Sequence, residues 1–271
     1  MAEERRRLIV ELLELEGRVH VEQLAERFDV SPVTIRKDLV ELEDRGLLQR
    51  VHGGAIYVHK SRYSLSFFEK VRFRAREKHA IAEAALEFIN EGDTIILDAG
   101  STTLALSELI KNRFRKLFVI TCSIPVALEL SHTTWDLMLV GGQVRHHTLA
   151  VIGPAAVSML ENYHVDKAFL GTTGLTLKQG YSTPNPLDAQ MKQAILRATD
   201  EAYVLADSSK IGHTALARFA RFDEAKVLIT DTSAPPDFLA EFQRRGLRYA
   251  LAKPETEPSN GEEKPSAPPL T

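Results

Sequence analysis

The sequence predicts an α/β protein: a small helical domain followed by a larger, mostly parallel α/β domain. Three observations lead to this prediction. Amphipathic helical segments fill residues 5–42, seven short apolar runs alternate with helical stretches between residues 95 and 251, and a length of 271 residues accommodates one large and one small domain. The apolar content of 44% is sufficient to fill the cores of both.

Composition narrows the class of protein. The 34 Lys and Arg against 37 Asp and Glu give a net charge of −3, which neither indicates nor excludes a nucleic-acid partner, because a basic face can be averaged out by an acidic domain. No run of about 18 apolar residues occurs, and residues 3–7 do not resemble a signal peptide. We therefore expect a cytoplasmic protein with no membrane partner.

Cysteine and histidine usage argues against metal and redox chemistry. The one cysteine, Cys122, excludes an internal disulfide and a CxxC motif. The nine histidines show no spacing typical of metal ligands. We expect no metal site and no cofactor.

The first sixty residues predict a helix-turn-helix. Apolar spacing indicates helices over residues 5–16 and 21–28, and a third helix that begins at Pro32 with Ser31 as its cap. On the third helix Ile35, Leu39 and Leu42 are expected to face inward. The residues expected at its exposed N-terminal turns are Ser31, Val33, Thr34, Arg36 and Lys37. A capped helix with cationic and hydroxyl groups at its start is suited to entering the major groove of DNA.

A wing follows the third helix. Residues 47–57 alternate around Gly53-Gly54, which predicts a two-stranded hairpin that carries Arg50, His52 and Gly53. A plain three-helix bundle is the alternative, because residues 1–60 hold ten Lys and Arg against twelve Asp and Glu. The concentration of cations on the third helix and the wing favours DNA.

The pattern from Ser31-Pro32-Val33-Thr34-Ile35-Arg36-Lys37-Asp38-Leu39 to the His52-Gly53-Gly54-Ala55 turn resembles the DeoR-type winged helix of bacterial sugar-responsive regulators. The resemblance continues to about residue 252. It implies operator DNA as a partner and a homodimer or homotetramer on paired half-sites.

Residues 61–78 are a basic segment, with six Lys and Arg against Glu69 and Glu77. Two interpretations stay open: a solvated linker helix, or a second strip that contacts DNA phosphates.

The seven apolar runs after the basic segment predict the strands of a parallel sheet. They are residues 95–97, 118–121, 137–140, 168–170, 203–206, 227–230 and 249–251. Because ligands bind outside the carboxyl ends of such strands, the residues that follow each run are candidates for a binding site.

Those residues are polar and include the parts of an anion site. Gly100-Ser101-Thr102-Thr103 at a helix start supplies free amides and hydroxyls, although the same residues also cap ordinary helices. Lys210 and Arg145 supply cations, and Asp98 a carboxylate for sugar hydroxyls. The candidate effector-site residues are Asp98, Gly100, Ser101, Thr102, Thr103, Thr121, Gly141, Arg145, Gly171, Thr173, Asp207 and Lys210. Together they indicate an anionic polyol ligand.

Asp98-Ala99-Gly100-Ser101-Thr102, Gly141-Gly142 with Arg145, and Ala206-Asp207-Ser208-Ser209-Lys210 resemble the effector domain of the same family. The resemblance implies a fold similar to ribose-5-phosphate isomerase and CoA transferases, and a phosphorylated sugar as effector. Thr121-Cys122 differs from the Thr-Asn usual in the family, which leaves the identity of the sugar open.

Catalysis is not expected, and no catalytic residues are assigned. A sugar-phosphate isomerase needs a carboxylate base, whereas Thr173, Thr176 and Gln190 occupy the positions where the isomerase pattern has acids. The leading hypothesis is a DNA-binding repressor of a sugar-metabolism operon, released by a sugar phosphate. Two alternatives remain: an isomerase-like enzyme with an accessory DNA-binding domain, and a DNA-bound scaffold with a vestigial pocket.

The predicted organisation has four parts. Residues 1–60 form the winged helix and residues 61–78 the basic linker, residues 79–252 bind the effector, and residues 253–271, with five prolines and no aromatic residue, form a disordered tail.

Overall fold

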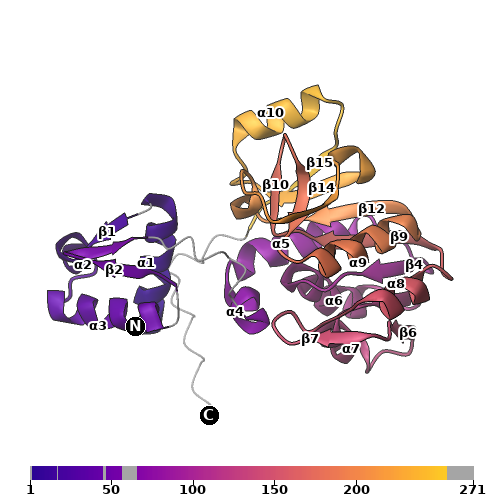
Figure 1. Ribbon diagram of the computed structural model, residues 1–271, viewed down its shortest axis with the longest axis horizontal. Coiled ribbons are helices and arrows are strands. Elements are labelled where there is room, and N and C mark those ends of the chain that lie inside the picture. The colour runs from indigo at the N-terminus through magenta and orange to yellow at the C-terminus, as the bar shows by residue number, and fades with distance from the viewer. Residues whose placement is uncertain (1, 17, 45–46, 57–65, 255–271) are drawn as a thin grey trace, which may run out of the picture. The chain divides into compact units, whose positions relative to one another are not determined.

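The computed structural model describes residues 2–16, 18–44, 47–56 and 66–254 of the chain. Its N-terminal unit contains the three helices that the sequence predicts. The helices are α1 (Ala2–Glu16), α2 (Val21–Arg27) and α3 (Pro32–Asp44) (Figure 1). They enclose a core that includes Ile9, Leu13, Leu24, Ile35 and Leu39. The periodic apolar residues of the sequence are thus the residues that the helices bury.

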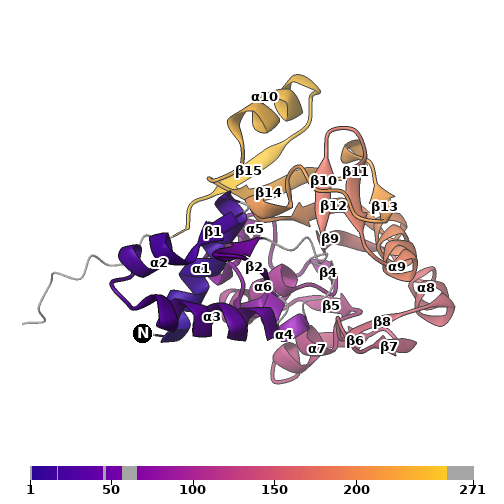
Figure 2. The same ribbon diagram turned by 60° about the vertical axis from the view of Figure 1, so that its left-hand side comes forward.

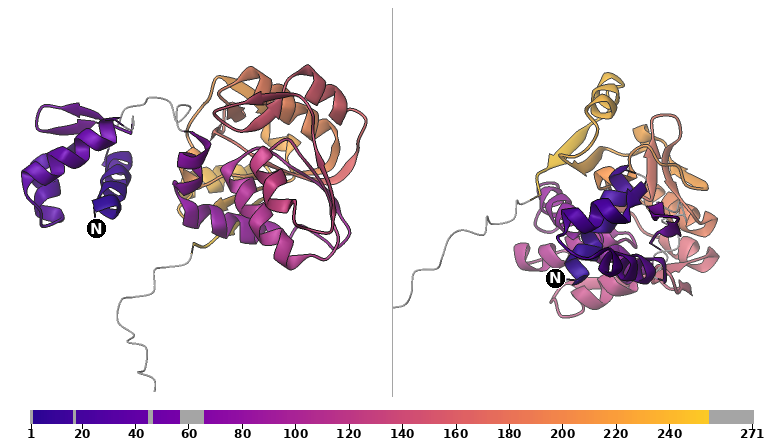
Figure 3. Two further views of the ribbon diagram at one scale, coloured as in Figure 1. Left: turned by 90° about the horizontal axis from the view of Figure 1, so that it is seen from below. Right: turned by 90° about the vertical axis from the view of Figure 1, so that its left-hand side faces the viewer.

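The predicted wing is part of a three-stranded sheet. Strands β2 (Gln49–Val51) and β3 (Gly54–Ile56) form the hairpin, and β1 (Arg18–His20), which the sequence analysis missed, pairs with β3 on its other side. The sheet is seen beside the helices in the left view of Figure 3. Gly54 is required where the strands meet, because a Cβ there would lie 2.0 Å from the Val19 carbonyl oxygen.

The chain divides into two units, Met1–Leu65 and Ser66–Thr271. Residues 66–78, expected to be linker, instead open the second unit as α4 (Phe67–Arg72) and the first turn of α5 (Ala75–Leu86). The reason is burial: Phe67 and Lys78 are almost inaccessible to solvent. The predictions for residues 61–65 and 255–271 lie outside the described residues.

The second unit is built on a seven-stranded parallel sheet in the order β15-β14-β12-β9-β4-β5-β6, whose strands succeed one another in Figure 2. All seven predicted runs are strands of this sheet. Their bounds are β4 Thr94–Leu97, β5 Phe118–Thr121, β6 Asp136–Leu139, β9 Val165–Gly171, β12 Thr199–Leu205, β14 Val227–Asp231 and β15 Tyr249–Ala252.

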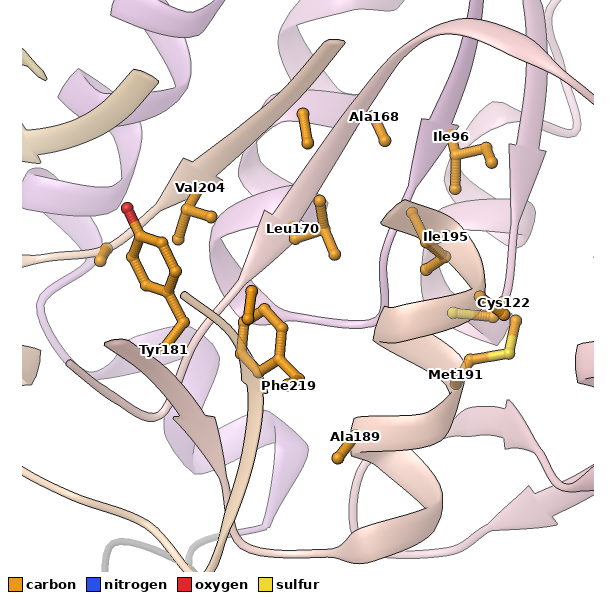
Figure 4. Close-up of a cluster of buried hydrophobic side chains, with 14 of the residues drawn as sticks. Ile96, Cys122, Ala168, Leu170, Tyr181, Ala189, Met191, Ile195, Val204 and Phe219 are labelled. Atoms are coloured by element: carbon orange, nitrogen blue, oxygen red, sulfur yellow. The ribbon is translucent and has the colours of Figure 1, made fainter. Parts of the chain in front are cut away.

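Helices cover both faces of the sheet. In β9, Phe169 packs toward α5, α6 (Ser101–Arg113) and α7 (Ile124–Leu130), whereas Ala168 and Leu170 pack toward α8 (Pro154–Leu160), α9 (Pro186–Arg197) and α10 (Pro236–Arg244). This alternation is the period of two expected of a strand buried on both faces. Figure 4 shows Cys122 in the core that contains Ala168 and Leu170, beside Met191 of α9.

Five short strands lie outside the central sheet and were not predicted. Strands β7 (Gln143–Arg145) and β8 (Ala150–Ile152) form a hairpin. Strands β10 (Gly174–Thr176), β11 (Gly180–Thr183) and β13 (Ala217–Ala220) form a small antiparallel sheet. Two single-turn helices, η1 (Ser208–Lys210) and η2 (Phe222–Glu224), complete the unit. In the part of the chain that the structure describes, every helix is too short or too polar to traverse a lipid bilayer.

Candidate functional site

The start of α3 faces solvent with the side chains that the sequence predicts there. The Thr34 amide donates to the Ser31 Oγ at 3.2 Å, so Ser31 caps the helix. Val33, Arg36 and Lys37 are exposed. Neither Arg36 nor Lys37 forms an ion pair with a described residue, which leaves both cations open to an anionic partner.

The wing places its predicted residues at the surface, with one complication. His52 and Gly53 are exposed in the turn between β2 and β3, where Gly53 has a φ of +78°. Arg50 is exposed but paired: its Nε donates to Glu43 Oε2 at 2.7 Å and its amide donates to Glu43 Oε1 at 2.8 Å. Because Glu43 belongs to α3, this pair ties the wing to the helix.

A buried carboxylate fixes α3 against α1. Arg5 Nε donates to Asp38 Oδ2 at 2.6 Å and Arg6 Nε donates to Asp38 Oδ1 at 2.9 Å, and Asp38 is only 2% exposed. The sequence analysis missed this contact. The signal was present, because Asp38 falls on the buried face of α3 between Ile35 and Leu42.

In the second unit the sheet order reverses between β4 and β9, which is where a parallel sheet opens a crevice at its carboxyl edge. Asp98 follows β4, and Gly171 ends β9. A Cβ at Gly171 would lie 3.8 Å from Asp98 Oδ2 and 4.0 Å from the Gly100 Cα. The predicted residues of these two strand ends therefore lie together.

Asp98 is the centre of a buried polar latch. Lys192 of α9 forms an ion pair with Asp98 Oδ2 and donates to the Gly171 carbonyl at 2.8 Å. The Gly171 amide donates to Asp98 Oδ2 at 3.0 Å, and the Cys122 Sγ lies 3.8 Å from Oδ1. Asp98 thus joins β4, β9 and α9, and burial beside this carboxylate raises the pKa of the Cys122 thiol.

The hydroxyls of Thr103 and Thr121 also serve the fold. Thr103 Oγ1 donates to the Asp98 carbonyl at 2.6 Å, and Thr121 Oγ1 donates to the Leu97 carbonyl at 2.7 Å. Thr102 is buried as well, whereas Gly100 and Ser101 are partly exposed. The predicted anion cradle therefore presents Gly100 and Ser101 more openly than its two threonines.

The end of β12 gathers cations around a second carboxylate. Asp207 lies 3.6 Å from both Lys210 Nζ and Arg74 Nη1, and Arg74 Nη1 donates to Ser208 Oγ at 2.8 Å. Burial acts to raise the pKa of Asp207, but Lys210, the Ser209 hydroxyl, Lys78 and Arg74 together hold it at about 2. Asp207 is therefore ionised at neutral pH.

A third cation and carboxylate pair stands on the β7 and α9 side of the site. Arg145 forms an ion pair with Asp188. Burial, together with the neighbouring charges of Lys210 and Arg145, lowers the pKa of Lys70 to about 8. Lys70 therefore stands near both cations, and its position connects the two sides of the site.

The site as a whole has an excess of positive charge. Six cations stand among at least four carboxylates, Asp98, Asp188, Asp207 and the Glu77 that pairs with Arg74. Two carboxylate oxygens, Asp188 Oδ1 and Asp207 Oδ2, are buried without a hydrogen bond from a described residue. The six cations are Lys70, Arg74, Lys78, Arg145, Lys192 and Lys210. Such a site suits an anion that also carries hydroxyl donors.

Of the remaining predicted residues, Thr173 and Gly171 are partly exposed at the end of β9, and Gly141 is exposed after β6. The sequence analysis did not assign Lys192, or the cations Lys70, Arg74 and Lys78, to this site. Lys78 was detectable, since it precedes Ile81, Ala82 and Ala85 on one helix face, whereas Lys192 pairs with a residue 94 positions away.

A winged helix with solvent-facing cations, joined to an α/β unit with a charged site at its strand ends, defines a DNA-binding regulator with a ligand-sensing domain. Residues 5–61 match the family model of the DeoR-like helix-turn-helix domain, and residues 74–232 match that of the DeoR C terminal sensor domain. The chain belongs to the DeoR family of transcriptional regulators.

Relatives span nearly the whole chain. It is 35% identical to the HTH-type transcriptional regulator GlpR of Haloferax volcanii, over 90% of this chain and 95% of that one. It is 32% identical to the HTH-type transcriptional regulator GolR of Listeria innocua, over 92% and 98%. It is 37% identical to the lactose phosphotransferase system repressor of Streptococcus mutans, over 84% and 92%.

Solved structures resemble the chain only distantly. Ribose 5-phosphate isomerase A of Methanocaldococcus jannaschii shares 20% identity with a TM-score of 0.37, covering 49% of this chain and 53% of its own. The translation initiation factor eIF-2B of Pyrococcus horikoshii shares 18% identity with a TM-score of 0.39, covering 80% and 73%.

Proposed function

We propose that this regulator represses a sugar-metabolism operon and leaves its operator when a phosphorylated sugar binds at the carboxyl ends of β4, β9 and β12. The observation that carries the proposal is the excess of cations beside two buried carboxylate oxygens that receive no hydrogen bond from the described residues. A phosphate would neutralise the cations, and sugar hydroxyls would donate to the oxygens. The Streptococcus mutans relative, named as a repressor of a lactose phosphotransferase system, supports the sugar connection.

In this proposal the exposed start of α3 and the wing contact the operator. Arg36 reads a base edge in the major groove, and the other cations bind phosphates. The full set of proposed DNA-contact residues is Ser31, Val33, Thr34, Arg36, Lys37, Arg50, His52 and Gly53. A single winged helix covers a short site, so the chain acts as a homodimer or homotetramer on paired half-sites.

Within the effector site, residues divide into those that bind and those that hold the site in shape. Lys210 and Arg145 take the phosphate, and Asp207 accepts from a sugar hydroxyl. Asp98, Thr103 and Thr121 hold the strand ends, because their polar groups already have partners in the fold. The remaining proposed lining is Gly100, Ser101, Thr102, Gly141, Gly171 and Thr173.

The protein acts by binding and not by turnover, and its proposed place of action is the cytoplasm. Each carboxylate of the site faces a cation: Asp98 faces Lys192, Asp188 faces Arg145 and Asp207 faces Lys210. The cations around Asp207 hold its pKa at about 2, which makes it a weak base toward carbon acids, whereas burial raises the pKa of Asp188.

Fluorescence anisotropy with DNA from upstream of the protein's own operon tests the proposal. We expect sequence-selective, salt-sensitive binding that one member of a panel of glycerol, pentose and hexose phosphates weakens. Lys210→Ala should bind DNA normally and lose the response. Release by no phosphate would contradict the sensor proposal, and steady conversion of a panel member by the wild-type chain would favour an enzyme instead.

A further inference from the structure

The turn between α4 and α5 is built into the effector site, although it lies next to the DNA-binding unit in the chain. Residues 57–65 separate β3 from Ser66, where the second unit begins. Arg74, in the turn, reaches 134 residues along the chain to donate to Ser208 Oγ at 2.8 Å. Residues 66–78 are therefore the part of the site closest in sequence to the wing.

The turn is held together from within by a buried lysine. Lys78 of α5 donates to the backbone carbonyls of Lys70 and Phe73, at the C-terminal end of α4, and is only 2% exposed. These carbonyls have no partner inside so short a helix, so Lys78 fixes α4 to α5. A displacement of Arg74 would thus move α4 along with it.

Arg74 is in a conformation that an arginine does not favour. Its φ of 50° and ψ of 44° lie in the left-handed region, which costs a residue with a Cβ. Its guanidinium has contacts on two sides: Nη1 lies 3.6 Å from Asp207 Oδ1 in the ligand site, and Nε lies 3.6 Å from Glu77 Oε1 on α5. The turn therefore has a strained arrangement that depends on what the guanidinium contacts.

Arg74 and Lys210 share Asp207. Each places a nitrogen 3.6 Å from that carboxylate, Lys210 at Oδ2 and Arg74 at Oδ1. A phosphate that binds Lys210 brings two negative charges next to Asp207, and a guanidinium binds phosphate by two parallel hydrogen bonds. The incoming phosphate would compete with Asp207 and Ser208 for Arg74.

We propose that Arg74 transmits effector binding: the phosphate of the effector takes the guanidinium from Asp207 and Ser208, the α4–α5 turn shifts, and the DNA-binding unit attached through residues 57–65 loses affinity for the operator. The inference rests on the proposed function and adds to it the residue that carries the signal. Arg74 is a positioning residue for the response and also a phosphate contact.

Four variants of the full chain separate the signal from the fold. Arg74→Gly removes the guanidinium and relieves the left-handed strain, and Arg74→Ala removes it and keeps the strain. Arg74→Lys keeps the positive charge but cannot form the two parallel hydrogen bonds of a guanidinium. Arg72→Ala, on the exposed surface of α4, is the matched control.

Two quantities are measured for each variant: the operator Kd by anisotropy with and without the panel phosphate that releases the wild type, and the phosphate affinity by calorimetry, with inorganic phosphate alongside. We expect Arg74→Gly and Arg74→Ala to bind operator like the wild type but to show a Kd ratio near one at saturating phosphate. Arg74→Lys should retain part of the ratio, and Arg72→Ala all of it.

Different outcomes would contradict the proposed function and the role of Arg74. A wild type that no phosphate releases overturns the proposed function and the inference with it. A wild type that responds, together with Arg74→Gly and Arg74→Ala that respond by the same factor at saturation, overturns the inference alone.

Discussion

Lysine and arginine serve the two units of this protein in opposite ways. On α3 of the first unit, Arg36 and Lys37 are exposed and face no carboxylate among the described residues. At the strand ends of the second unit, Lys192, Arg145 and Lys210 are largely buried, and each faces an aspartate. Lysine and arginine side chains are thus solvated on α3, whereas carboxylates hold them in fixed positions at the strand ends of the second unit.

The difference follows from what each surface binds. Duplex DNA is a large polyanion that attracts exposed cations by releasing counterions, so the cations need no fixed partner. A small anion offers few charges, so its site has to be shaped beforehand, and buried cations require carboxylates to remain charged. Substitutions of the exposed cations of α3 should therefore alter DNA binding alone, and substitutions at the strand ends should alter folding as well.

The largest effect is expected at the Lys192–Asp98 pair. Lys192→Met leaves a buried carboxylate without its cation, and we expect the second unit to lose about 3–5 kcal/mol of unfolding free energy. Urea unfolding followed by the fluorescence of Trp135, the single tryptophan of the chain, reports this unit. Adding Asp98→Asn should restore part of the loss. A loss below about 1 kcal/mol would mean that the pair is not a buried structural latch.

The first unit also buries charged groups, at the contact of Asp38 with Arg5 and Arg6. Asp38→Ala removes the acceptor of Arg5 and Arg6, and we expect a loss of about 1.5–3 kcal/mol, the usual size for hydrogen bonds to charged groups. Amide hydrogen exchange of α1 and α3 in the full chain measures it. Asp44→Ala, at the exposed end of α3, is the control. Unchanged amide exchange in Asp38→Ala would show that Asp38 does not hold α3 against α1.

Arg36→Ala should change DNA binding without changing stability. We expect a loss of about 1–3 kcal/mol on the operator if Arg36 reads a base, with random DNA much less affected. Lys37→Ala should weaken both DNAs alike and reduce the salt dependence. Anisotropy at two salt concentrations measures both variants, and an equal loss on operator and random DNA in Arg36→Ala would exclude base reading.

The smallest expected effect is a pH dependence that only the second unit should show. Lys70 has a pKa of about 8, so effector affinity should fall as the pH rises from 7 to 9, by about tenfold for one lost charged contact. The sugar phosphate itself stays dianionic there, since its second pKa is about 6. Calorimetry should detect proton uptake near pH 8, and Lys70→Arg should reduce it, because Lys78 of the same site also has a pKa of about 8. A flat pH profile would remove Lys70 from the site.

The same pKa shift has the opposite consequence for folding. Because the pKa of Lys70 lies below the ordinary value for lysine, the folded chain binds fewer protons than the unfolded chain between about pH 8 and 10.5. The stability of the second unit therefore gains from Lys70 as the pH rises through this range.

Sequence patterns predicted the features of the fold that repeat locally. Each strand of the central sheet is a short apolar run, and Ser31 with Pro32 marks the start of α3, because these signals depend only on neighbouring residues. β1 was missed because three residues with one apolar side chain carry no period. Its pairing with β3 depends on Gly54, 34 positions after the strand ends.

The effector site was predicted in outline, since strand ends of a parallel sheet meet at one edge. Which side chains are free there was not predictable. Asp98 looked like a ligand-binding carboxylate, and only the packing of α9 brings Lys192 onto it. Likewise Arg74 looked like part of a linker, because its contact with Ser208 depends on how α5 lies against the sheet.

Effector binding and operator binding must affect each other equally if the two sites are coupled. A sugar phosphate and operator DNA are proposed to bind competing states of one chain. DNA must then lower the affinity for the sugar phosphate by the same factor by which the sugar phosphate lowers the affinity for DNA, typically about 5–150-fold. Phosphate affinity should therefore be measured by calorimetry on the free chain and on the operator complex. Our account predicts equal factors from the two directions. Phosphate that binds the free chain and the DNA complex with the same affinity would contradict it.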